Sequence, residues 1–362
     1  MTDAPGRPDP TKEIRMTTLH ATRGANFWSS RPVMRMDLSV GAYEDISSAD
    51  VPGFTESLLS AMPGLIEHRC SIGERGGFVI RLRDGTYAAH IVEHVALELQ
   101  TMIGHDVGYG KTRGGDIEGE YTLVFEHLHE GVGLRSAALA LETVQHAFAG
   151  TLSSVDHAVA ELTALAATPD VPPIQQHVLC GITGGSDRAA TRDEIVRRGF
   201  GSNDLIVDVS PVFLLQAGLP YSRSDIAIVT DTALTDVPER YQEEERAQQL
   251  VSTVADAVER NGIVIVPAKE WEVQDKVREA GCRVAIFAAD SNVTRRDRKV
   301  ARAVALVMNE RIVIDSRGER TDHGPVRQDA PVAAQVAGAL AAFTLNELQP
   351  NPAAVVAGSA KD

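Results

Sequence analysis

The chain has 362 residues, 43% hydrophobic and 23% charged, which is typical of a globular protein large enough for two or three domains. Its net charge of −15 and its pI of about 5.2 argue against nucleic acid as the main partner, because nucleic-acid binding requires clustered Lys and Arg side chains. The charge is compatible with a cationic partner. Three widely spaced cysteines predict no disulfide framework and a reducing, cytoplasmic location. No apolar run reaches the roughly 18 residues of a membrane span.

The first half of the chain predicts an α+β domain over residues 16–150, preceded by a disordered segment. Residues 1–15 are polar and Pro-rich and lack the apolar stretch of a signal peptide. Alternating apolar residues predict strands, whereas apolar residues recurring every three or four positions predict helices. The expected strands are 31–40, 76–86 and 119–128, and the expected helices are 53–65, 86–103 and 133–150.

The second half predicts a different architecture after a boundary at 151–176, which combines an Ala-rich helix with a Pro-rich linker. From 177 to 345, short apolar runs alternate with helical stretches, which is typical of a doubly wound, mostly parallel α/β domain. Residues 346–362 are expected to be a tail. The expected strands are 177–183, 204–209, 225–231, 262–268, 283–289 and 310–314, and the clearest helix is 243–261.

The expected helix 86–103 carries the sequence "HIVEHVALELQ" with His90, Glu93, His94 and Glu98. At 100° per residue these four side chains share one arc of about 140°, and aliphatic residues occupy the opposite side. Two histidines one turn apart can both reach one tetrahedral zinc ion, and Glu93 can hold a metal-bound water as the general base. The order His-x-x-Glu-His is also that of an inverted zinc-hydrolase motif.

The third ligand of such a zinc site has three candidates: Glu98 is the first choice, and Cys70 and Glu126 are the alternatives. The competing interpretation is that the polar strip of this helix is an ordinary solvated face with Glu–His contacts. Cys70 also has a competing interpretation as a small buried hydrophobic residue.

Several segments of 16–150 together resemble the N-terminal domain of cyanophycin synthetase. They are "TRGANFWS", "VMRMDL", "PGF", "EHRCSIGERGGF", "HIVEHVALELQ", "VGYGKTR" and "YTLVFEH", in the order and spacing of that family. The resemblance implies a domain that binds cyanophycin, a polymer with an aspartate backbone and arginine side chains, and that in some members also cleaves it with zinc. In the shared segments, Arg75 and Arg113 are expected to bind ligand carboxylates, with structural ion pairs as the alternative.

The second half resembles the Mur-ligase-like C-terminal domain of the same family, without the ATP-grasp domain that precedes it there. The resemblance rests on "QAGLPYSRSDIAIVTD" and "VADAVERNGIVIVPAKEWEV". The family's phosphate loop is altered in "ITGGSDRAAT", where Asp187 replaces a glycine, Arg188 the phosphate-binding lysine and Ala189 the Mg²⁺-binding threonine. Asp208, Asp231 and Asp236 replace a glutamate, an asparagine and a histidine. No ATP binding is therefore expected.

The function expected from the sequence is a zinc-dependent hydrolase of cyanophycin or a related arginine/aspartate isopeptide. Its Mur-ligase-like domain would be inactive and would serve in docking or oligomerisation. The alternative is a non-catalytic binding or regulatory protein of the cyanophycin synthetase type. The expected partners are cyanophycin or an Arg-rich peptide and a second copy of the chain, with neither nucleic acid nor membrane.

Overall fold

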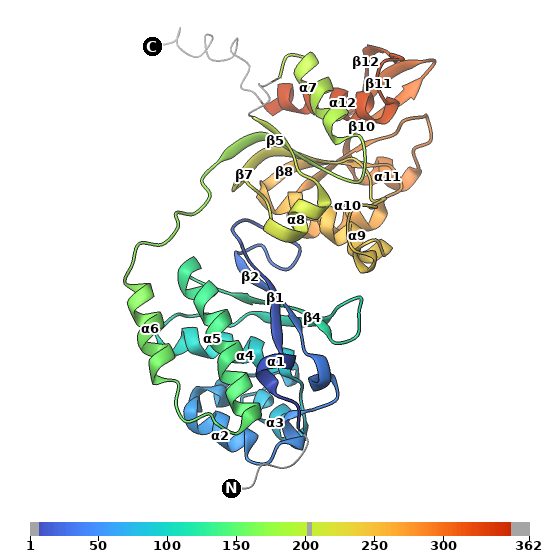
Figure 1. The fold of residues 1–362 in the computed structure, drawn as a ribbon. Coiled ribbons are helices and arrows are strands. Elements are labelled where there is room, and N and C mark those ends of the chain that lie inside the picture. The colour runs from blue at the N-terminus through green and yellow to red at the C-terminus, as the bar shows by residue number, and fades with distance from the viewer. Residues whose placement is uncertain (1–6, 201–204, 349–362) are drawn as a thin grey trace, which may run out of the picture. The chain divides into compact units, whose positions relative to one another are not determined.

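The protein is described by a computed structural model over residues 7–200 and 205–348. The chain folds into two compact units (Figure 1). Unit 1 comprises Met1–Arg23 and Arg31–Pro173, and unit 2 comprises Gly24–Ser30 and Ile174–Asp362. The main division, after Pro173, falls within the boundary expected at 151–176. Among the described residues, no helix is long and apolar enough to cross a bilayer.

Unit 1 contains a four-stranded antiparallel sheet with the order β1-β2-β4-β3. In the central strand β2, Met34, Met36 and Leu38 are buried in the core of the unit, while Asp37 accepts hydrogen bonds from neighbouring side chains. This alternation is why the segment forms a strand with one face against the core. The strands are β1 Arg15–Thr22, β2 Val33–Ser39, β3 Gly110–Gly114 and β4 Glu120–Glu126.

Helix α4, Ala88–Met102, packs against α5, β3 and β4, and its apolar side belongs to the same core as the sheet. Ala, Leu, Glu and Gln residues favour this helix, and Gly104, with a φ of 88°, follows its end as a left-handed residue. The other helices are α1 Pro10–Glu13, α2 Phe54–Ala61, α3 Gly77–Asp84, α5 Glu130–Ala149 and α6 Asp156–Ala166, with 3₁₀ turns at Gly41–Glu44, Ser48–Asp50, Pro63–Glu67 and Cys70–Ile72.

Two predictions for unit 1 are wrong. The segment 76–86 is the helix α3 and not a strand, because Phe78, Val79 and Leu82 form one buried helical face. Residues 7–15 are not disordered: α1 lies there, and the fully buried Ile14 anchors it in the core. Residues 1–6 of the expected disordered segment lie outside the described residues.

Unit 2 is built on an eight-stranded sheet with the order β12-β11-β10-β9-β8-β7-β5-β6. Strands β5 to β10 pair in parallel with one another. Strands β11 and β12 extend the sheet in antiparallel orientation beyond β10. This sheet confirms the mostly parallel α/β class. The strands are β5 His177–Thr183, β6 Ile206–Asp208, β7 Arg223–Val229, β8 Val258–Pro267, β9 Arg283–Phe287, β10 Ala301–Met308, β11 Arg311–Ser316 and β12 Glu319–Pro325.

Helices cover both faces of this sheet, as expected for a doubly wound arrangement (Figure 1). Two helices, α7 and α12, lie on one face, and α8, α9 and α10 lie on the other. The bounds are α7 Arg188–Arg197, α8 Pro211–Ala217, α9 Glu244–Ser252, α10 Trp271–Glu279, α11 Arg295–Val300 and α12 Val332–Leu348, with 3₁₀ turns at Glu239–Tyr241 and Thr253–Ala257.

Two boundaries in unit 2 differ from prediction. The helix expected at 243–261 ends at Ser252, because a 3₁₀ turn follows and Val258 already begins β8 beside β7. Helix α12 runs to Leu348 and so includes the first residues of the expected tail at 346–362. Residues 349–362 lie outside the described residues.

Candidate functional site

A pocket of about 870 Å³ lies in unit 1 between α4, β3 and the segment from Gly64 to Arg81. Its walls include all four polar residues of the predicted strip on α4 and two residues from the preceding segment. These are His68, Cys70, His90, Glu93, His94 and Glu98. The four residues of the predicted strip therefore lie on one wall of the pocket, and their role in metal binding stays a prediction.

The polar strip of α4 is not a solvated face. Glu93, His94 and Glu98 are only 5%, 6% and 4% exposed. The apolar side of α4 packs into the core, while the strip is covered by the segment that carries His68 and Cys70. Burying carboxylates and imidazoles is costly unless they gain partners, and each of these groups has one.

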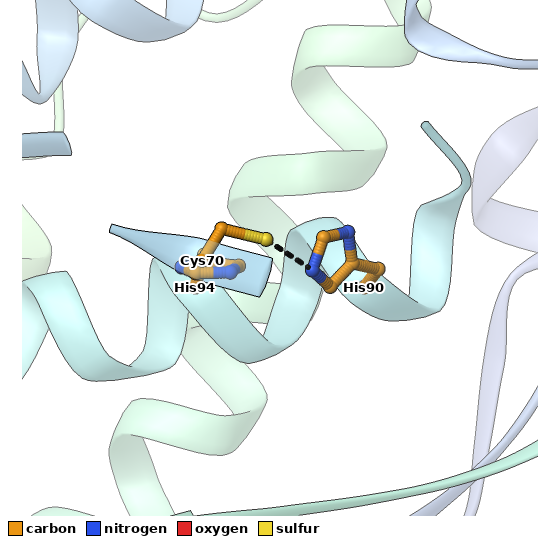
Figure 2. Close-up of side chains that lie close together, drawn as sticks. All are labelled: Cys70, His90 and His94. Atoms are coloured by element: carbon orange, nitrogen blue, oxygen red, sulfur yellow. Dashed lines mark hydrogen bonds between the residues drawn. The ribbon is translucent and has the colours of Figure 1, made fainter. Parts of the chain in front are cut away.

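Cys70, His90 and His94 form a compact cluster whose donor atoms lie within 4.8 Å of one another. Figure 2 shows the Cys70 sulfur facing His90, and the Cys70 Sγ atom lies 3.4 Å from His90 Nε2. Cys70 has a φ of 50°, a left-handed conformation that costs a non-glycine residue about 1–2 kcal/mol. One cysteine sulfur and two imidazole nitrogens are a common ligand set of protein-bound zinc ions.

Burial keeps both imidazoles of the cluster neutral. It lowers the pKa of His90 to about 4, with the charge of Arg81 acting in the same direction. Burial also places the pKa of His94 well below the ordinary value, helped by His90, His68 and Arg81. At neutral pH each ring therefore has a free nitrogen lone pair, which metal binding requires.

The structure favours Cys70 over Glu98 as the third ligand. Glu98 Oε2 instead lies 3.1 Å from His68 Nε2, and His68 Nδ1 lies 2.8 Å from His94 Nδ1. Glu126 is also engaged elsewhere, because it pairs with Arg31 at 2.9 Å. Helical spacing aligns Glu98 with the two histidines, which is why the sequence favours it as a ligand. In the structure, His68 lies between Glu98 and His94, so Cys70 replaces Glu98 as the candidate third ligand.

Glu93 lies beside the cluster and has its own partner. The hydroxyl of Thr112, on β3, donates a hydrogen bond to Glu93 Oε2 at 2.5 Å. Burial raises the pKa of Glu93 to about 7, although the Thr112 hydrogen bond opposes this rise. This carboxyl group therefore accepts and releases a proton near neutral pH.

The cations of the pocket are not the predicted ones. Arg75 is exposed and forms a bidentate ion pair with Glu67, which is the structural alternative, and Arg113 is exposed on β3 and does not line the pocket. Arg81 and Lys111 line the pocket, and within the described part of the chain neither forms an ion pair. The strand predicted for 76–86 does not single out Arg81, and Lys111 lies two residues before the predicted Arg113 in "GKTR".

In unit 2, the segment "ITGGSDRAAT" spans the end of β5 and the turn that follows it. The carboxylate of Asp231 accepts hydrogen bonds from the backbone N–H groups of Gly185 at 3.1 Å and Ser186 at 2.8 Å. Arg192 pairs with Asp208 at 2.6 Å. An internal carboxylate thus lies at backbone N–H groups of the kind that bind phosphate in such turns, and the absence of ATP binding stays a prediction.

Comparison with known proteins finds relatives of the unit that holds the pocket. Residues 33–149 match the family of cyanophycin synthase-like N-terminal domains. The cyanophycin synthetase of Synechocystis sp. is 48% identical over 118 residues, covering 31% of this chain and 13% of that protein. That of Crocosphaera subtropica is 40% identical over 161 residues, covering 42% of this chain and 18% of that protein. The resemblance to cyanophycin synthetase is confirmed for a stretch that spans less than a fifth of these relatives.

Solved structures similar to the chain include two ligases. A UDP-N-acetylmuramoyl-L-alanyl-D-glutamate–2,6-diaminopimelate ligase has a TM-score of 0.34 at 10% identity, covering 62% of this chain and 59% of the other. A pseudomurein peptide ligase type C from Methanothermus fervidus has a TM-score of 0.33 at 10% identity, covering 54% and 56%. The α/β class of unit 2 rests on its own sheet.

The prediction of a zinc-dependent hydrolase, with Glu93 as its base, is corrected by these comparisons. The relatives at 40% and 48% identity are named synthetases, and a synthetase joins its substrates whereas a hydrolase cleaves them. The physical reason for the error is that His-x-x-Glu-His specifies donor groups at helical spacing, and the same groups bind a metal or a polar ligand without cleaving anything.

Proposed function

We propose that unit 1 binds cyanophycin or a related arginine-rich isopeptide in the pocket beside α4. The observation that carries the proposal is that this pocket presents both signs of charge. Arg81 and Lys111 offer cationic groups without ion-pair partners among the described residues, while Glu93 offers a carboxyl group in the interior. The match of residues 33–149 to cyanophycin synthase-like domains supports this ligand class.

The chemistry of the polymer suits such a mixed pocket. An arginine joined to an aspartate side chain through its amine keeps a guanidinium group and a free carboxylate. Arginine and lysine side chains bind carboxylates with charge-assisted hydrogen bonds, and carboxylates bind guanidinium groups in the same way. Recognition of both groups would give a role to cations that have no ion-pair partner among the described residues, in a protein of net charge −15.

The proposal includes a zinc ion held by Cys70, His90 and His94. These residues fit the metal, because their donors are close together and the imidazoles are neutral. A zinc ion would supply a Lewis acid that binds an oxygen atom of the ligand. Glu93, which accepts a hydrogen bond from Thr112, would accept a further one from the ligand.

Binding of a soluble aspartate–arginine polymer to the whole chain, measured by isothermal titration calorimetry, tests the pocket. We expect Arg81→Ala to weaken binding about 10-fold, since a hydrogen bond to a charged group contributes about 1.5–3 kcal/mol. The control is Arg83→Ala, which removes an exposed arginine from the same helix outside the pocket. Equal affinities for the two variants, or no binding by the wild type, would exclude this function for the pocket.

A further inference from the structure

A chain of hydrogen-bonding groups links Glu98 to the Cys/His cluster. Glu98 Oε2 lies 3.1 Å from His68 Nε2, and His68 Nδ1 lies 2.8 Å from His94 Nδ1. The side chains of His68 and Glu98 are 13% and 5% exposed, so little water competes for these contacts. Three groups from two segments of unit 1, α4 and the chain at His68, are therefore joined in one line.

The two contacts of His68 relate the hydrogens along this line. A carboxylate oxygen accepts hydrogen bonds, so the contact with Glu98 assigns the donor role to His68 Nε2. When the His68 ring carries that one N–H, its Nδ1 atom is an acceptor. His94 Nδ1 must then carry the hydrogen and donate it to His68. The lone pair of His94 is consequently on Nε2.

Packing against neighbouring residues also restrains the orientation of the His94 ring. Phe78 stacks on it with ring centroids 3.9 Å apart and an interplanar angle of 21°. At the Glu98 end of this line of hydrogen bonds, a Cβ atom at Gly64 would lie 1.9 Å from Glu98 Oε1. Only glycine at position 64 therefore leaves room for the carboxylate. Packing thus keeps the side chains of His94 and Glu98 close to His68, which lies between them.

His90 shows the same arrangement by a different partner. The hydroxyl of Thr86 lies 2.8 Å from His90 Nδ1, and His90 Nε2 is the ring atom that approaches Cys70 Sγ. In both histidines the Nδ1 atom is engaged by a neighbour. Ligand histidines of metal sites commonly have such a second partner, which sets the tautomer and the ring orientation.

We propose that Glu98 and His68 are positioning residues that hold the hydrogen of His94 on Nδ1 and present its Nε2 lone pair to the cluster. Glu98 is thereby assigned a role other than that of a ligand. The inference that Glu98 and His68 position a metal ligand rests on the proposed zinc site. The inference about the tautomer of His94 does not depend on a bound metal.

The tautomer is measured by long-range ¹H–¹⁵N NMR of the metal-free, full-length protein at pH 8, where histidine is ordinarily neutral. We expect the ¹⁵N shifts of His94 to place its hydrogen on Nδ1. In His68→Phe the ring of His94 should lose this preference. A wild-type His94 with its hydrogen on Nε2 overturns the proposal, whether or not any metal or polymer binds.

Zinc affinity, measured by competition with a chelator, tests the metal-positioning part. We expect Glu98→Ala and His68→Phe to weaken zinc binding roughly 10- to 100-fold, as is usual when the partner of a ligand is removed. Glu98→Gln should stay within a few-fold of the wild type, because its amide oxygen still accepts the His68 hydrogen. Glu56→Ala, an exposed change on α2, is the control.

The conservative variant separates positioning from ligation. An amide is a poor zinc ligand, so a glutamate that bound the metal would make Glu98→Gln as weak as Glu98→Ala. That result overturns the positioning role, as does unchanged affinity in Glu98→Ala. A protein that binds no zinc contradicts the proposed metal site, and the NMR result still decides the tautomer.

Discussion

A single glycine in β3 determines where the Glu93 carboxylate lies. A Cβ atom at Gly110 would lie 2.5 Å from Glu93 Oε1 and 2.9 Å from its carboxyl carbon. At Gly114, four residues further along the same strand, a Cβ atom would meet no atom within 4 Å. Neither glycine has a positive φ, so steric space alone distinguishes the two positions.

This contrast gives a prediction for one methyl group. Gly110→Ala should push Glu93 away from Thr112 and destabilise the protein by about 1–3 kcal/mol, the usual effect of overpacking. Gly114→Ala should change stability by less than about 0.5 kcal/mol. Denaturant unfolding followed by circular dichroism measures both. Equal stability of the two variants would mean that β3 yields to the added methyl group.

At the scale of secondary-structure elements, buried Glu194 connects α7 to the segment before α12. Its carboxylate accepts hydrogen bonds from Arg197 at 2.6 Å, Arg198 at 2.7 Å and Arg327 at 2.9 Å. Burial by itself raises the pKa of Glu194, but the hydrogen bonds from the three arginines outweigh it and hold the pKa below 4.5. A carboxylate with a lowered pKa stabilises the fold only while it is ionised.

The pH dependence follows from this sign. The stabilisation from Glu194 is fully present above the unfolded-state value of 4.5 and is lost as the pH falls through the lower folded-state pKa. Glu194→Gln should therefore cost about 3–5 kcal/mol at pH 7, and its stability should fall less steeply below pH 4.5. Urea unfolding across this range measures the effect, with the exposed Glu319→Gln on β12 as the control. Parallel pH profiles for Glu194→Gln and the wild type would contradict it.

At the scale of the whole molecule, unit 2 includes a short segment from the N-terminal part of the chain. Gly24–Ser30, between β1 and β2, belongs to unit 2. There Phe27 packs edge-to-face on Trp28 and Tyr241, with ring centroids 4.8 Å and 5.1 Å apart. The backbone of the segment is also held, because Leu219 donates its N–H to the Ala25 carbonyl at 2.8 Å.

The stability of unit 2 should therefore depend on an N-terminal residue. Phe27→Ala should destabilise unit 2 by about 3–5 kcal/mol, as is usual for a buried phenylalanine. The two tryptophans, Trp28 and Trp271, are both in unit 2, so their fluorescence reports its unfolding. Phe54→Ala, in the core of unit 1, should leave the fluorescence midpoint nearly unchanged. Similar shifts in both variants would show that the two units unfold together.

The sequence by itself determined the elements whose pattern is local. The 3.6-residue period of α4 placed His90, Glu93, His94 and Glu98 on one strip, and the continuous apolar strands of the second half predicted a mostly parallel sheet. These predictions succeeded because helix and strand periodicity is set by backbone geometry. The segment 76–86 failed because Phe78, Ile80 and Leu82 also satisfy the two-residue period of a strand.

Only the tertiary structure decided which groups meet. Cys70 joins His90 and His94 because a 3₁₀ turn distant in sequence covers α4, and His68 separates Glu98 from the cluster. Arg81, and not Arg75, faces the pocket for the same reason. Sequence spacing fixes neighbours within one helix, whereas the contacts between helices, turns and strands depend on how the shared core packs.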